Sequence, residues 1–106
     1  MARAVVTVPP RAKRGEIVEI KTRAQHPMET GFWRTQTGEL IPRDIIRTFR
    51  CAYNGVEVYR VDLHPAIAAN PLIAFTTVAT ESGTLTFRWV GDNGYTVTEI
   101  AAIRVE

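Results

Sequence analysis

The feature that most constrains the fold is a strict alternation of apolar and other residues in several short segments. In residues 84–90, Leu85, Phe87 and Trp89 occupy every second position. Successive side chains of a β-strand point to opposite faces of a sheet, so the pattern places these three side chains on one buried face. Residues 16–23 alternate in the same way, and no segment shows the period of an amphipathic helix. The chain is therefore expected to be all-β.

Turn residues separate the alternating segments and indicate how the strands are connected. Asn54-Gly55 joins two segments and is a strong hairpin signal, because both positions of a type I′ turn need a positive φ. In the last segment Ile100 is out of phase with the other apolar residues, so a β-bulge is expected near Glu99 or Ile100. Strands with this spacing and no helix predict an immunoglobulin-like β-sandwich of about seven strands. The expected strands are residues 4–8, 16–23, 45–53, 56–62, 72–80, 84–90 and 95–106.

Length, charge and hydropathy exclude several classes of protein. A chain of 106 residues has the usual length of a single domain, which is expected to span residues 1–106. The net charge is +2 and its basic residues are scattered, so no nucleic-acid partner is expected. The apolar runs are too short for a membrane span or for the core of a signal peptide. Cys51 is the only cysteine, so no internal disulfide is possible.

A long segment between expected strands, residues 24–44, stands out from the rest of the chain. Loops of this length in compact domains are usually functional or disordered. The segment is expected to contain a small hairpin with Thr37-Gly38 at its tip. Phe32 and Trp33 are adjacent, so on a strand they point to opposite faces. Either one of them caps the core while the other is half exposed, or both form a partner interface.

A second irregular segment, "DLHPAIAANP", spans residues 62–71. Proline at position 65 suits the first turn of a helix, and Pro71 disfavours helical geometry at the residue before it. Residues 65–70 are therefore expected to form one short helical crossover turn between the two sheets, with Ile67 pointing inward. A histidine precedes proline both here, at His64, and at His26. The stiff backbone at each of them suits recognition as well as a turn.

No reaction centre or metal site is expected from the residue types and their spacing. His26, Met28, Cys51 and His64 carry the groups of a mononuclear copper site, but such sites gather these ligands in one short loop. Cys51 instead lies within an expected strand and is interpreted as a buried structural cysteine. The only serine, Ser82, lies in a hairpin turn and not in a nucleophile elbow. The protein is therefore expected to be no enzyme and to hold no cofactor.

Several long motifs resemble one known family over nearly the whole chain. They are "VEIKTRAQHPMETG", "IPRDIIRTFRCAYNG", "DLHPAIAANP" and "ATESGTLTFRW", and they occur in the same order in the SoxZ family. SoxZ is the smaller subunit of the sulfur-carrier complex in the thiosulfate-oxidising (Sox) system of the periplasm. The resemblance implies an immunoglobulin-like fold and a heterodimer with SoxY, whose C-terminal-arm cysteine carries the sulfur intermediates.

The resemblance also implies what this chain does within the complex. It ends in "AAIRVE" without a Gly-Gly-Cys segment, which matches the non-carrying subunit, so Cys51 is not the carrier cysteine. The implied role is a rigid scaffold that binds SoxY and is docked by the cytochrome, hydrolase and dehydrogenase components of the Sox system. SoxZ has no signal peptide of its own, so the implied location is the periplasm, by co-export with the partner. The residues expected at the partner interface are His26, Met28, Phe32, Trp33, His64 and Ile67.

Two other classes of function remain open on the residues themselves. One is a stand-alone immunoglobulin-like binding module. The other is a small metal-binding β-sandwich, similar to cupredoxins or superoxide reductases. If the chain is produced without its partner, it is expected to form homo-oligomers through the surface that the partner would cover.

Overall fold

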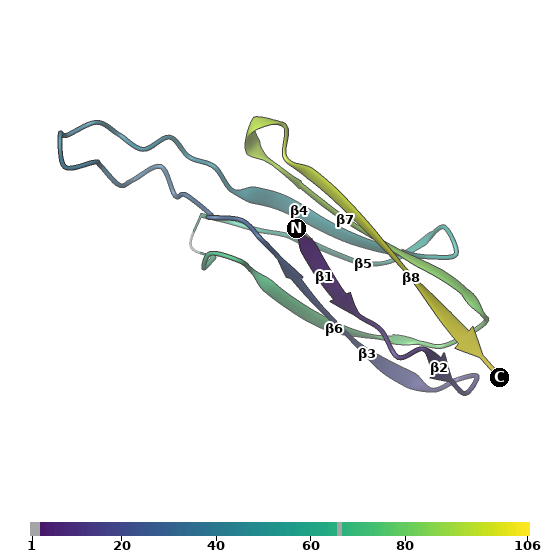
Figure 1. Cartoon of the computed structure of the whole chain (residues 1–106). Coiled ribbons are helices and arrows are strands. Elements are labelled where there is room, and N and C mark those ends of the chain that lie inside the picture. Colours follow the sequence, from purple (N-terminus) through teal and green to yellow (C-terminus); the bar gives the residue numbers. More distant parts are fainter. Residues whose placement is uncertain (1–2, 66) are drawn as a thin grey trace.

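The computed structural model describes residues 3–65 and 67–106, and it is a β-sandwich of two sheets (Figure 1). The first sheet has the order β1-β3-β6, and the second has the order β2-β8-β7-β4-β5. The predicted all-β, immunoglobulin-like fold is confirmed. No helix in the described residues is long and apolar enough to cross a membrane. The strands are β1 (Ala4–Thr7), β2 (Arg11–Ala12), β3 (Ile17–Ala24), β4 (Ile46–Tyr53), β5 (Val56–Asp62), β6 (Leu72–Val78), β7 (Gly83–Gly91) and β8 (Thr96–Val105), with a 3-10 turn, η1 (Asp92–Gly94), between β7 and β8.

The alternating side chains meet between the two sheets and form an aromatic core. Phe49 of β4 and Phe87 and Trp89 of β7 are fully buried there, as the alternation in β7 predicts. Tyr59 of β5 stacks on Phe75 of β6 with ring centroids 4.3 Å apart, and this contact joins one sheet to the other. The core thus fixes the relative position of the sheets along their length.

The bulge predicted near Glu99 or Ile100 is wrong. The ladder between β7 and β8 runs without a shift along its whole length. Ile100 is out of phase because it lies on the outer face of β8, where its side chain is 65% exposed. The register shifts occur in β4, one of them between Cys51 and Ala52 opposite β5.

The two predicted turns differ in outcome. Asn54 and Gly55 both have positive φ, 48° and 83°, and connect β4 to β5 as the dipeptide predicts. Residues 63–71 do cross from β5 to β6 and hence between the sheets, but the predicted helical turn over residues 65–70 is wrong. Of these, Ala66 lies outside the described residues, and the others form turns, bends and irregular backbone. The Ile67 N–H donates to the His64 carbonyl at 3.0 Å, and Asn70 has φ of 51°, which a helix does not allow.

Residues 29–44 form a long two-stranded extension, here called the arm, that projects from one end of the sandwich (Figure 1). Main-chain hydrogen bonds join its two halves, for example from Ile41 N–H to the Trp33 carbonyl at 2.9 Å. The tip lies at Thr35–Gly38, so the predicted hairpin is confirmed. The arm makes the molecule 59 Å long but only 23 and 19 Å across, and its radius of gyration is 16.2 Å. A compact domain of this length would have about 13 Å.

Candidate functional site

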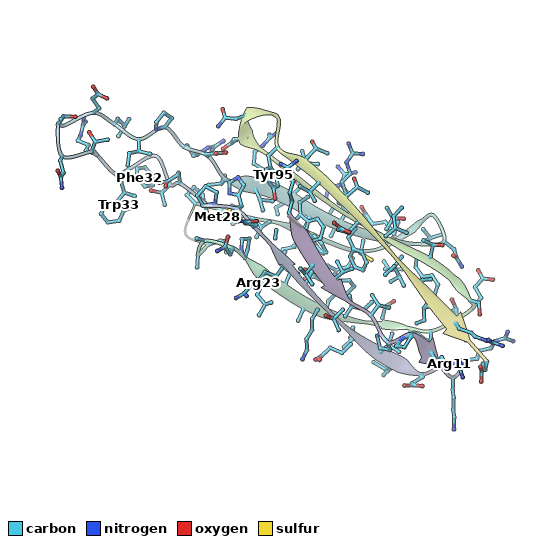
Figure 2. All side chains as sticks on the ribbon, viewed as in Figure 1. Arg11, Arg23, Met28, Phe32, Trp33 and Tyr95 are labelled. Atoms are coloured by element: carbon cyan, nitrogen blue, oxygen red, sulfur yellow. The ribbon has the colours of Figure 1, made fainter. Side chains whose placement is uncertain are left out.

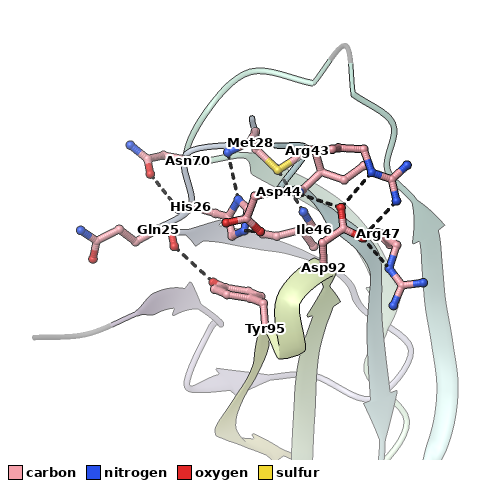
Figure 3. Close-up of polar contacts among 11 residues, drawn as sticks. Gln25, His26, Met28, Arg43, Asp44, Ile46, Arg47, Asn70, Asp92 and Tyr95 are labelled. Atoms are coloured by element: carbon pink, nitrogen blue, oxygen red, sulfur yellow. Dashed lines mark hydrogen bonds and ion pairs between the residues drawn. The ribbon is translucent and has the colours of Figure 1, made fainter. Parts of the chain in front are cut away.

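The arm is fixed to the sandwich by a set of polar contacts at its base (Figure 3). Glu29 and Asp44, on its two halves, exchange main-chain hydrogen bonds of 2.7 and 2.9 Å. Side chains from three other segments lie beside this pair, namely those of His26, Asn70 and Asp92. The arm therefore leaves the sandwich in a defined direction.

His26 lies inside the base of the arm, with only 3% of its surface exposed. Its Nδ1 accepts a hydrogen bond from the Met28 main-chain N–H at 2.9 Å, and the His26 main-chain N–H donates to Asn70 Oδ1 at 2.9 Å. Because Nδ1 accepts the hydrogen bond from Met28, Nε2 is the ring nitrogen that faces the other neighbours. That nitrogen lies 3.4 Å from Asp44 Oδ1, and the ring meets Tyr95 edge-on.

Met28 is also interior. Its thioether sulfur accepts a hydrogen bond from the Ile46 N–H at 3.2 Å, and its φ of 52° lies in the left-handed region. Both residues are expected at the partner interface, and in the structure both side chains are buried. What they contribute to a surface is the position of the arm.

Asp92, in the turn between β7 and β8, is a residue whose role the sequence did not indicate. Its carboxylate accepts two hydrogen bonds from the Arg43 guanidinium, at 2.9 and 3.0 Å, and one from the Ile45 N–H at 3.2 Å. The Arg47 guanidinium lies 3.3 Å away. Burial alone would raise the pKa of Asp92, but these hydrogen bonds and the two positive charges together lower it. Asp92 thus ties the returning half of the arm to the sandwich.

Phe32 and Trp33 lie on the arm, away from the core (Figure 2). Phe32 is 81% exposed and Trp33 is 66% exposed, so neither side chain caps the core. Of the two expectations for this pair, the one in which a ring covers the core is wrong. Leu40, on the opposite half of the arm, is exposed as well. The arm therefore presents apolar groups to its surroundings.

His64 and Ile67 lie in the crossover at the same end of the sandwich as the base of the arm. Both side chains are exposed, so Ile67 does not point inward as predicted. The crossover is linked to the arm base through Asn70, whose N–H donates to the His26 carbonyl at 2.7 Å. The six residues singled out from the sequence thus gather at one end of the molecule, with two inside it and four on its surface.

The groups considered for chemistry from the sequence are not assembled for it. Cys51 is fully buried in β4, and burial raises the pKa of its thiol to about 12. Among residues 3–65 and 67–106, no three His, Cys, Asp or Glu side chains lie together as metal ligands. Ser82 lies at the opposite end of β6 from His64, and its hydroxyl accepts the Val105 N–H at 2.8 Å. That hydroxyl has a structural role.

With this geometry in view, comparison with known proteins settles the family. Residues 6–102 match the family of the sulphur oxidation protein SoxZ. The chain belongs to the SoxZ family. This membership supports a role in the Sox system of sulfur oxidation. No curated protein matches the sequence.

Several solved structures share the fold at low sequence identity. Superoxide reductase (neelaredoxin) from Ignicoccus hospitalis has a TM-score of 0.78 and 19% identity, covering 99% of this chain and 81% of that one. A putative superoxide reductase from Thermotoga maritima has a TM-score of 0.73 and 19% identity, covering 97% and 85%. The sulfur carrier protein SoxY from Chlorobium limicola f thiosulfatophilum has a TM-score of 0.68 and 12% identity, covering 100% and 81%. At these identities the likeness concerns the fold alone.

Proposed function

We propose that this protein is the non-catalytic scaffold subunit of the SoxYZ sulfur-carrier complex, in which it binds SoxY during the oxidation of thiosulfate. The SoxZ family match over residues 6–102 carries the proposal. SoxY has the same fold, so two sandwiches of similar size would form the body of the complex. The carrier cysteine belongs to SoxY, and this chain holds that subunit in place while its sulfur-bearing arm reaches successive enzymes.

The state of Cys51 is consistent with a scaffold role. A sulfur carrier needs an accessible thiolate, because the thiolate is the nucleophile. The Cys51 thiol is fully buried and its pKa is raised to about 12, so at neutral pH it is protonated and out of reach. Sulfur chemistry in the complex therefore falls to the partner.

The arm supplies a contact surface for the complex. Aromatic side chains are enriched in protein interfaces, and large exposed ones are unusual on a surface without a partner. Phe32 and Trp33 are held at a fixed position because the base of the arm is anchored through Asp92 and His26. We assign these two aromatic residues, together with His64 and Ile67 in the neighbouring crossover, to contacts with SoxY or with the docking Sox enzymes.

Co-production with the SoxY of the same organism tests this function. Size-exclusion chromatography with light scattering should show a one-to-one complex. The variants Phe32→Ala, Trp33→Ala and His64→Ala are then compared with Ile100→Ala, a matched control on the outer face of β8. An interface hot spot loses about 2 kcal/mol or more on truncation, which corresponds to roughly thirtyfold weaker binding.

The outcomes separate the parts of the proposal. If the unmodified chain and SoxY form no complex, the scaffold function is refuted. If a complex forms and all three variants bind SoxY like the control, these residues are not in the SoxY interface. In that case, slower thiosulfate oxidation by the reconstituted Sox enzymes with Trp33→Ala would assign the arm to enzyme docking.

We also propose that the protein works in the periplasm and reaches it by co-export with SoxY. The proposal rests on what the resemblance to the SoxZ family implies. Fractionation of cells that produce the chain with and without SoxY tests it. The chain should enter the periplasm only when SoxY carries its export signal, and export of the chain without SoxY would contradict co-export.

A further inference from the structure

The two sheets end in four edge strands, and three of these are protected against pairing with another chain. An edge strand exposes unpaired main-chain groups, and proteins protect such edges by short length, proline or charge. β1 has four residues and is followed closely by Pro9-Pro10, and β2 has only two residues. β5 carries Glu57, Arg60 and Asp62 along its length. These three edges are poor templates for a further strand.

The fourth edge, β6, has none of these protections. Its sequence, LIAFTTV, is seven residues long with no charge and no proline. It pairs only with β3, so its other side is free within the described residues. Such uncharged segments with high β-propensity pair readily with other strands. An edge of this kind is expected to be covered in the working protein.

The register shows which main-chain groups of β6 are free. Ala24 N–H donates to the Pro71 carbonyl and Ala79 N–H donates to the Glu16 carbonyl, so odd-numbered positions of this segment bond to β3. Hydrogen-bonded and non-hydrogen-bonded pairs alternate along an antiparallel ladder. The free N–H and C=O groups therefore belong to the even-numbered residues, which are Leu72, Ala74, Thr76 and Val78.

Apolar grooves accompany this edge along its length, between β6 and β5. One of about 470 Å³ is lined by Val56 and Val58 of β5 and by Val78 of β6, among others. Another, of about 270 Å³, is lined by Tyr59, Ile67 and Leu72, among others. The apolar side chains that line these grooves would pack against one face of a strand that pairs with β6.

We infer that SoxY adds one of its own edge strands to β6, so that a sheet continues from one subunit into the other. This rests on the proposed function, since it names where the proposed partner binds. A seven-residue edge is about 23 Å long, and the sandwich is 19 to 23 Å across. The product of these two lengths is about 440–530 Å², somewhat more than half of the about 800 Å² that each partner buries in a standard interface. The SoxY fold covers this whole chain and so includes a counterpart of β6.

Amide hydrogen exchange of the chain, free and in complex with SoxY, tests the inference directly. In the free chain the even-numbered amides from Leu72 to Val78 should exchange fast, while those of Ile73, Phe75 and Thr77 are already protected by β3. Complex formation should slow the even-numbered amides at least tenfold and leave the odd-numbered ones nearly unchanged. This alternation serves as an internal control, because general burial would protect both sets.

A proline at the edge gives a second readout. Ala74→Pro removes one free N–H donor while leaving the bonds to β3, since edge strands accept proline on their free side. The loss of that bond should weaken SoxY binding about tenfold. The matched control is Arg60→Pro on the β5 edge. The Leu63 N–H donates to the Arg47 carbonyl, so odd-numbered residues at this end of β5 bond to β4 and the Arg60 N–H is free. The control should bind SoxY within about twofold of the unmodified chain.

The results distinguish this inference from the proposed function. No complex with the unmodified chain would refute the proposed function. A complex in which the even-numbered β6 amides still exchange fast would overturn the inference alone, as would a folded Ala74→Pro variant that binds SoxY normally. Protection of these amides in a homodimer of the free chain, without further change on adding SoxY, would assign the edge to self-association. If Ala74→Pro does not fold by circular dichroism, exchange in the unmodified chain decides.

Discussion

Asp92 offers a quantitative test of how the arm is held. Replacing it by Asn removes the negative charge that pairs with Arg43 and Arg47 but keeps the shape of the side chain. Hydrogen bonds to charged groups contribute about 1.5–3 kcal/mol each. Because both guanidinium groups are about half exposed, solvent reduces this contribution, and a net loss of about 1–2 kcal/mol is expected. For a domain of this size that corresponds to a Tm lower by roughly 5–10 °C at pH 7, measured by differential scanning calorimetry.

The pH dependence of this difference checks its origin. The pKa of Asp92 is lower in the folded protein than in the unfolded chain, where an aspartate has a pKa of about 3.9. Its contribution to the free energy of unfolding is therefore fully present above about pH 5 and is lost as the pH falls through the folded pKa. The difference in Tm between the unmodified protein and Asp92→Asn should shrink toward zero as the carboxylate is protonated.

A matched control is Asp62→Asn, because Asp62 is 66% exposed and its nearest contact with Arg60 is 3.9 Å. This change should alter stability by less than about 0.5 kcal/mol. A Tm for Asp92→Asn equal to that of the control at pH 7, or a difference that persists undiminished at low pH, would refute the account of Asp92.

Three further predictions concern stability and reactivity. Cys51 should not react with thiol reagents between pH 7 and 9 in the native protein, because burial raises its pKa to about 12. In guanidinium, which unfolds the chain, it should react at once. Fast labelling of the native protein would contradict its burial. Gly83→Ala should lower stability by about 1–3 kcal/mol, because the new Cβ would lie 1.8 Å from Asn54 Oδ1 and displace it from the hydrogen bond that it accepts from the Thr84 N–H. Urea unfolding measures this loss. Asn54→Ala in the same chain should remove the clash, so the double variant should lose less stability than the two single variants summed. Additive losses would contradict the clash. Trp33→Ala should leave the Tm within about 2–4 °C, since surface changes usually stay within ±0.5 kcal/mol. A larger loss would mean that the ring supports the fold.

The fold was predictable from the sequence wherever one local pattern decided the structure. The alternation around Phe87 and Trp89 and the Asn54-Gly55 dipeptide predict a buried face and a turn, because both depend on neighbouring residues only. The error at Ile100 arose because an apolar residue was assumed to be buried. On this strand the outer face meets solvent, and the phase of the alternation never changes.

The site was less predictable because its contacts join distant positions. The sequence places His26 at the partner interface, but in the structure it is buried against Asn70 and Asp44, which lie 44 and 18 residues away. Asp92 lies between two expected strands, and nothing near it in the sequence indicates that Arg43 of the arm and Arg47 of β4 will pair with it. Such roles depend on which loops meet at one end of the sandwich, and a local pattern does not contain that information.

The burial of Cys51 has a practical consequence for observing this protein at work. With the native thiol shielded, a cysteine introduced at an exposed position such as Thr37, at the tip of the arm, becomes the single site that takes a fluorescent dye or a spin label. A second probe on the partner would then report the distance between arm tip and partner in solution. Movements of the proposed complex could then be followed in solution with the native Cys51 left in place.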